Sequence, residues 1–275
     1  MLKRNQTSQS LLLNSLRGQQ ILPLNQKRLS PDAAATLCDI KLDDEGSTRR
    51  TLGLLPMPQS RYGHEITETD TLRLQMLLLS IESKKISCCL RVFSESTKSR
   101  SAVLIYRGRL IGCVYGKRGE EQHFGKQAFN KIMDDLVSQG NLLDTYKLTD
   151  ELALAAAALF HGGLNQVFNG APASEIYPKC ARMVANNKRT GCIVCKDNGE
   201  GAISITYLFE GAIVGVYSFS EGWQTPTQTA ALNTIDRVGG AELWLAVLPI
   251  ETESAESLTE SLTGLDFMPK THGSK

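Results

Sequence analysis

The sequence predicts an α+β fold in which two tandem repeats of one small antiparallel sheet, each flanked by helices, follow one another. Two observations carry this prediction. A succession of helix, three strands, helix and strand occurs twice, and antiparallel strands flanked by helices are typical of α+β proteins. The two successions also align without a gap, because Gly211 in the second lies 103 positions after Gly108 in the first.

We expect the first repeat over residues 69–163 and the second over residues 172–250, and a length of 275 residues allows two domains of this size. Hydrophobic periodicity and β-branched runs place the elements. In the first repeat these are a mostly buried leucine-rich helix, three strands, an amphipathic helix, a strand and an alanine-rich helix capped by Thr149, over residues 70–83, 86–93, 101–106, 109–115, 122–139, 142–148 and 150–160. In the second they are a helix, three strands, a helix and a strand, over residues 174–186, 189–195, 202–209, 212–219, 225–238 and 241–248.

Two pairs of coincident glycines support the duplication more strongly than matching apolar residues do. Gly108 and Gly211 occupy the turn between the second and third strands, where glycine allows a positive φ. Gly112 and Gly215 lie inside the following strand, where glycine indicates a bulge or the close approach of another backbone.

The two ends of the chain lack this periodicity. We expect residues 1–68 to form a flexible basic arm and residues 251–275 a disordered polar tail. The first 31 residues contain five Lys or Arg and no acidic residue, which is typical of a solvated arm and leaves an organelle transit peptide open. Within the arm, residues 31–38 fit a short helix, and residues 49–57 fit an edge strand.

Composition bounds the partners and the compartment. A net charge of +1 gives no general attraction to nucleic acid, and no run reaches the ~18 to 20 apolar residues of a membrane span. We therefore expect that the protein does not bind nucleic acid and that no segment spans a membrane. The seven cysteines are odd in number and lie mostly in apolar runs, which favours a reduced, cytoplasmic setting.

The two repeats resemble the PATAN-like domain of bacterial signalling and gliding-motility proteins, a family named after the N-terminal region of a cyanobacterial response regulator. The resemblance rests on KKISCCLRV (84–92), AVLIYRGRLIGCVYG (102–116) and GKQAFNKIM (125–133), and on residues 188–193 and 209–215 of the second repeat. It covers residues 70–149 and 174–249. It implies protein–protein interaction in signalling and no catalysis. Residues 86–88 depart from it, because the family usually has a threonine–glycine pair there.

No catalytic residue, metal site or cofactor is expected. Cys192 and Cys195 have the spacing of a redox or zinc pair, but residues three apart in a strand point to opposite faces. The four histidines show no metal-ligand spacing. These residues are therefore interpreted as structural.

Lys117 and Arg118 form the best candidate for a ligand site. They follow a strand and precede a helix, which is the context of anion binding at a helix N-terminus. The neighbouring Glu120 and Glu121 would repel phosphate, and the second repeat has no basic residue at this place.

Three further residue sets are candidates for an interaction surface. Arg107 and Arg109 flank the first hairpin turn, where the second repeat has Glu210 and Ala212. This reversal of charge indicates that the repeats present different surfaces. Trp223 is expected in a loop, where an exposed aromatic side chain is a plausible binding anchor.

We therefore expect a non-enzymatic, cytoplasmic bacterial signalling or scaffold protein that works through protein partners, with self-association left open. One alternative is a sensor of a small anion or nucleotide at Lys117 and Arg118. Another is a roadblock- or longin-like regulator of a small GTPase, whose sheet has a longer uninterrupted succession of strands.

Overall fold

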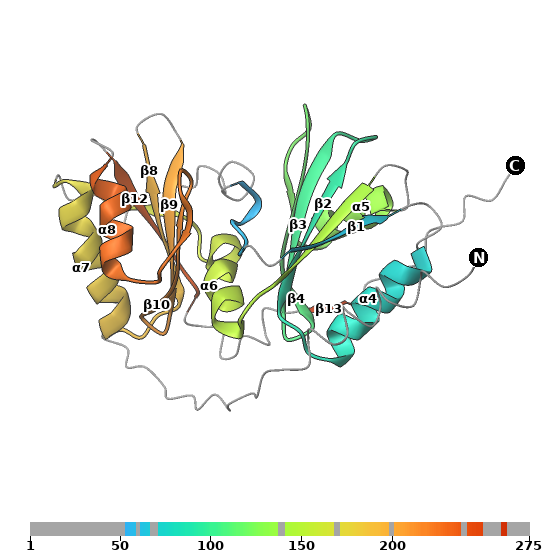
Figure 1. The fold of residues 1–275 in the computed structure, drawn as a ribbon, viewed down its shortest axis with the longest axis horizontal. Coiled ribbons are helices and arrows are strands. Elements are labelled where there is room, and N and C mark those ends of the chain that lie inside the picture. The colour runs from blue at the N-terminus through green and yellow to red at the C-terminus, as the bar shows by residue number, and fades with distance from the viewer. Residues whose placement is uncertain are drawn as a thin grey trace, which may run out of the picture. The chain divides into compact units, whose positions relative to one another are not determined.

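The computed structural model describes residues 53–58, 61–66, 71–136, 141–167, 171–197, 201–237, 241–249 and 260–262. These residues form two antiparallel sheets with their own helices (Figure 1), so the protein has the expected α+β fold. The expected helix over residues 31–38 lies outside the described residues.

The first sheet has the strand order β1-β6-β2-β3-β4-β13, with β5 paired to β4. Its strands are β1 (Arg61–Ile66), β2 (Cys88–Ser94), β3 (Ser99–Tyr106), β4 (Arg109–Lys117), β5 (His123–Phe124), β6 (Asn141–Lys147) and β13 (Glu260–Ser261). Helices α4 (Thr71–Ser83) and α5 (Gly125–Leu136) pack on one face and share a buried core with it.

The second sheet has the order β11-β10-β9-β8-β12-β7. Its strands are β7 (Asn165–Gln166), β8 (Gly191–Lys196), β9 (Ala202–Phe209), β10 (Ala212–Ser218), β11 (Gly222–Gln224) and β12 (Glu242–Val247). Helices α7 (Ala173–Asn186) and α8 (Gln228–Asp236) cover one face and form a separate core with it (Figure 1).

The duplication extends to backbone detail. Strand β9 repeats β3 at an offset of 103 positions. In the first hairpin the register shifts so that Ile111 has no partner in β3, and in the second Val214, also 103 positions later, has none in β9. Each is a β-bulge, in agreement with the glycine that follows it. The turns match as well, with φ of 47° and 79° at Arg107 and Gly108 and of 48° and 81° at Glu210 and Gly211.

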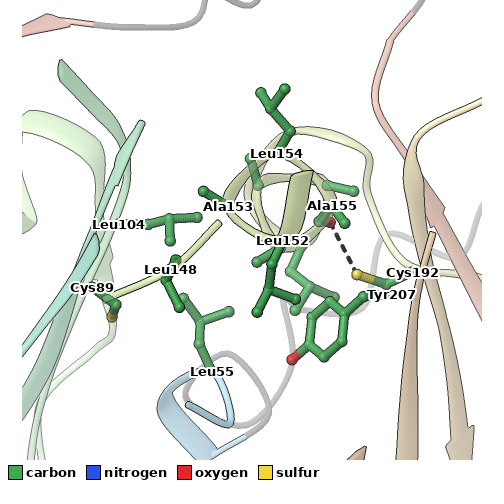
Figure 2. Close-up of a cluster of buried hydrophobic side chains, with 14 of the residues drawn as sticks. Leu55, Cys89, Leu104, Leu148, Leu152, Ala153, Leu154, Ala155, Cys192 and Tyr207 are labelled. Carbon is green, nitrogen blue, oxygen red and sulfur yellow. Dashed lines mark hydrogen bonds between the residues drawn. The ribbon is translucent and has the colours of Figure 1, made fainter. Parts of the chain in front are cut away.

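Helix α6 (Asp150–His161) packs against both sheets. All eight residues from Leu152 to Leu159 are buried. They share one core with Cys89, Leu104 and Ile111 of the first sheet and with Cys192, Ile205 and Ala246 of the second. Figure 2 shows the helix between the two sheets, with the Cys192 thiol donating to the Ala155 carbonyl over 3.0 Å. We expected this helix only as the end of the first repeat.

The helix begins where the sequence predicts. The Thr149 hydroxyl accepts a hydrogen bond from the Leu152 amide at 3.2 Å, and Asp150 and Glu151 follow in the first turn. A side-chain oxygen at the N-cap satisfies an amide that the helix leaves unpaired, and acidic residues near that end favour the helix dipole.

Parts of the expected arm and tail are structured, contrary to the sequence-based expectation. Strand β1 pairs with β6 as an edge strand at residues 61–66, whereas residues 53–57, which are the described part of the expected edge strand, do not form a strand. Leu55 is fully buried. In the tail, β13 pairs with β4 and Leu262 is fully buried in the first core. The two-residue strand β13 and the single buried leucines leave no periodicity to detect in a sequence.

Each turn glycine lies against the backbone of a helix, Gly108 against the end of α4 and Gly211 against the end of α7. A Cβ at Gly108 would lie 2.8 Å from the Glu82 Cα, and a Cβ at Gly211 would meet the Ala185 backbone. Gly119 and Gly222 share a φ of 81° but have nothing within 4 Å of such a Cβ. These two glycines therefore serve as controls for backbone conformation alone.

We predict that Gly119→Ala and Gly222→Ala each lower the free energy of unfolding by about 1–2 kcal/mol, which is the cost of a left-handed alanine. Gly108→Ala and Gly211→Ala should cost at least about 1 kcal/mol more, because the new methyl group overpacks the helix backbone. Denaturant titration measures both pairs. Equal losses in the two pairs would show that the close approach is unimportant.

Candidate functional site

The outer face of α4 exposes two large apolar side chains. Met76 and Leu79 are each 54% exposed, whereas Leu74, Leu78 and Ile81 on the inner face are buried. Residues three positions apart lie side by side on a helix, so Met76 and Leu79 form one apolar strip on the surface. The expectation of a mostly buried helix was therefore wrong for this face.

The equivalent helix of the second repeat, α7, has a charged outer face in place of this strip. At the offset of 103, the buried inner residues of α4 correspond to Tyr177, Ala181 and Val184, which are also buried. The exposed positions correspond to Lys179 and Arg182, which are exposed. The inner face of this helix is therefore buried in both repeats, whereas the outer face is apolar in the first repeat and charged in the second.

The hairpin turns differ in charge, as the sequence predicts, but Arg107 is held by a structural contact. Its Nε donates to Asp150 Oδ2 at 2.6 Å, and its amide donates to the Ser87 hydroxyl at 2.9 Å. The Ser87 hydroxyl in turn donates to Asp150 Oδ1. The hydrogen bond to Asp150 raises the pKa of the Arg107 guanidinium. Arg107 therefore ties the first hairpin to the start of α6.

Among the described residues, the second turn has no equivalent of this ion pair. The Glu210 amide donates to the Thr190 hydroxyl at 3.1 Å, and the Glu210 residue is exposed. Arg109 is also exposed and pairs through its backbone position with Ser261 of β13. Of the four turn positions, Arg109 and Glu210 are the ones whose charges face solvent.

The basic loop differs from the expected arrangement at a helix N-terminus. Lys117 ends β4 and forms an ion pair with Glu120 at 2.6 Å, which raises the pKa of Lys117. Arg118 is exposed. Strand β5 then intervenes, and α5 begins at Gly125 and not at residue 122. The ligand site at Lys117 and Arg118 stays a prediction, with its lysine already paired to a carboxylate.

Trp223 lies in strand β11 and not in a loop. Its ring stacks on Tyr207 at 5.7 Å between centroids and meets Tyr217 edge-on at 5.6 Å. A Cβ at Gly215 would lie 2.7 Å from Trp223 Cζ3, so the strand glycine makes room for the indole. Gly112 does the same for the Phe160 ring of α6. In both repeats the close approach at this glycine involves an aromatic ring and not a backbone.

Two buried polar atoms of this aromatic group have no hydrogen-bond partner in the described part of the chain. They are the Tyr207 hydroxyl and Trp223 Nε1. Tyr207 is fully buried, and desolvation raises its pKa well above the ordinary value. A buried hydroxyl without a partner costs about 1–3 kcal/mol, so such atoms are rare in folded proteins.

Residues 53–58, which we call the inserted segment, pack into the core around α6. Leu54 is 3% and Leu55 0% exposed, and both belong to the same buried cluster as the helix. Figure 2 shows Leu55 beside Leu148 and Leu152, between Cys89 and Tyr207 of the two sheets. The backbone is left-handed over three consecutive residues, with φ of 74° at Gly53, 65° at Leu54 and 51° at Leu55. Each non-glycine residue in this region costs about 1–2 kcal/mol.

The cysteines are placed as structural residues. The Cys192 side chain lies in the core around α6 and that of Cys195 in the core under α7 and α8, so the pair points to opposite faces, as predicted. Burial raises the pKa of Cys89 and of Cys195 to about 12. Among the described residues, no group of His, Cys, Asp and Glu could hold a metal ion.

One comparison with known proteins gave a match. Residues 57–159 match the model of a family described as "Uncharacterized protein conserved in archaea (DUF2226)". The match spans β1 to the last turn of α6 and covers less than half of the chain. No curated protein and no solved structure matched.

This match overturns the resemblance to the PATAN-like domain. The part of the chain that carried the resemblance in the first repeat is similar to an archaeal family without a described function. The motifs that suggested the bacterial family are strand and turn patterns, which unrelated α+β modules share. The assignment to a bacterial signalling family is therefore withdrawn.

Within the described ranges, every helix is too short or too polar to cross a lipid bilayer.

We predict that the six described thiols do not react with a thiol reagent in the native chain at pH 8, because all six are buried. A Cys38→Ser chain removes the remaining cysteine, and denaturant should then release all six at once. A thiol that reacts rapidly without denaturant would contradict this placement.

The same thiols give a pH dependence of stability. Their pKa is higher in the folded chain than the ordinary value of 9.0, so the folded state retains protons that the unfolded state loses. Their contribution to stability is complete below pH 9 and is lost as the pH rises toward 12. In Cys195→Ala, the free energy of unfolding should fall less steeply with pH. Denaturant titration between pH 9 and pH 12 measures this slope.

Proposed function

We propose that this chain is a non-enzymatic protein that acts through protein–protein contacts of two diverged modules, with the outer face of α4 as the contact surface of the first. The observation that carries the proposal is the exchange at equivalent helix positions. Met76 and Leu79 are exposed on α4, where α7 exposes Lys179 and Arg182. The same position in the fold therefore carries charged side chains in the second repeat and exposed apolar side chains in the first.

The chemistry of the strip indicates the kind of partner. Helices that dock into apolar grooves use side chains spaced three or four positions apart as anchors. Methionine suits such contacts because its side chain is flexible and polarizable. The partner is thus a protein with an apolar groove or helix face, and a second copy of this chain is one such protein. Neither nucleic acid nor lipid is required by this surface.

The structure gives less support to the two alternatives. A sensor of an anion or nucleotide would use Lys117, which is paired with Glu120. In both sheets a helix interrupts the strands. The strand after the helix then pairs with the first strand of the preceding hairpin, β6 with β2 in the first sheet and β12 with β8 in the second. A roadblock- or longin-like regulator is expected to have a longer uninterrupted succession. We therefore favour the contact function, in a regulatory or signalling role and in the cytoplasm, where buried free thiols are common.

A photo-crosslinking amino acid tests the proposal at matched positions. Placed at Leu79 in the full chain, it should capture a defined protein or a second copy in cells, whereas the same group at Arg182 should not. The captured protein is then purified and titrated against the Met76→Lys, Leu79→Arg chain, which carries the residues of the second repeat.

Binding should fall at least tenfold in that chain, because each charge must be desolvated against an apolar partner. Circular dichroism and the unfolding midpoint should stay unchanged, since both positions are exposed. Lys179→Ala, Arg182→Ala is the control and should bind normally. Capture at both positions alike, or undiminished binding by the charged chain, would refute the role of α4.

A further inference from the structure

From the inserted segment we infer that the space between the two sheets is a peptide-binding groove, occupied in the free chain by residues 53–58 as an internal ligand. The external ligand is a short segment of another protein that presents two adjacent large aliphatic side chains. This groove is separate from the outer face of α4, and the inference does not rest on the function proposed for that face.

The first argument is the conformation of the segment. Gly53, Leu54 and Leu55 are all left-handed, and a non-glycine residue stays in that region only where its surroundings enforce it. Here the enforcement comes from the two leucines, which are 3% and 0% exposed in the core around α6. A ligand that fills the same positions from an ordinary extended backbone would make these contacts without the strain.

The second argument is chemical. The Tyr207 hydroxyl and Trp223 Nε1 are both hydrogen-bond donors, and neither has an acceptor among the described residues. They belong to the wall that the second sheet contributes to this core. A Cβ added at Gly53 would lie 3.5 Å from the ring of Phe219, which follows β10. In Figure 2 the Tyr207 hydroxyl points to the side of α6 on which Leu55 lies. A ligand whose carbonyl groups reach these donors gains hydrogen bonds that the inserted segment lacks.

The third argument is connectivity. The segment is tethered near the groove by the chain itself, which gives it a high effective concentration. Strain and unmet hydrogen bonds offset part of that advantage. The internal ligand is therefore poised to exchange with an external one. The open groove is a minor state of the free chain, and a sufficiently good competitor shifts the population toward it.

The experiment uses the full chain and a fluorescein-labelled peptide with the sequence of residues 51–58, TLGLLPMP. In the Leu54→Asp, Leu55→Asp chain the internal ligand cannot enter the apolar core, so the groove is free. We expect this chain to bind the peptide at least tenfold more tightly than the unsubstituted chain does, as measured by fluorescence anisotropy. A peptide with Asp in place of Leu54 and Leu55 should not bind either chain.

The matched control is Lys179→Asp, Arg182→Asp, which places the same two aspartates on the exposed face of α7 and leaves the inserted segment in place. It should bind the peptide as weakly as the unsubstituted chain. Equal peptide binding by all three chains would overturn the inference, and so would the absence of binding to the Leu54→Asp, Leu55→Asp chain when that chain is folded.

Hydrogen exchange of the unsubstituted chain keeps the inference testable if the doubly substituted chain fails to fold. The amides of Leu54, Leu55 and Met57 should exchange at least a hundredfold faster than those of α6, through an opening that does not depend on denaturant. Exchange as slow as that of α6 would show a permanent part of the core and overturn the inference.

Discussion

The contact on which the rest of the structure depends is the burial of α6 on all of its faces. A helix that is apolar all round must be covered on all sides, and here the two sheets provide most of the cover. Its four consecutive alanines, Ala155 to Ala158, let both sheets approach closely, and the Cys192 thiol reaches the Ala155 carbonyl. A larger side chain at any of these four alanine positions would push the sheets apart.

This shared helix explains why the repeats diverged differently on their two sides. The sheet faces toward α6 are constrained by one common core, and the bulges and turn glycines that shape them are the same in both repeats. The outer helices face solvent or partners and are free to change. On these outer helices, the apolar strip of α4 occupies positions that are equivalent to the charged positions of α7.

Much of the fold could be predicted from the sequence because it depends on local signals. The gapless offset, the turn glycines and Thr149 each have a backbone reason that a sequence displays. The helix over residues 150–160 was predicted as the end of the first repeat, but its burial between two sheets was not, because a sequence does not name the second sheet that covers it. Strand β13 and the inserted segment could not be predicted, because a two-residue strand and a six-residue segment that are held by tertiary contacts carry no periodicity.

The candidate sites were harder to predict, since each depends on what a side chain meets. The sequence predicted Arg107 as a surface charge, but Asp150 lies beside it, and it predicted Trp223 in a loop, but β11 pairs with β10. The strip on α4 was within reach of the sequence. Aligning Met76 and Leu79 with Lys179 and Arg182 separates the two outer faces without any structure.

The most direct test of the account asks whether α6 joins the two sheets into one cooperative unit. Both tryptophans, Trp223 and Trp244, lie in the second sheet, so tryptophan fluorescence reports its unfolding alone. Leu90→Ala opens a cavity in the core between the first sheet and its own helices, at a cost of about 2–5 kcal/mol. If α6 couples the sheets, the denaturation midpoint reported by the tryptophans falls in this variant. A tryptophan midpoint that stays where it is in the unsubstituted chain would contradict the central role of α6.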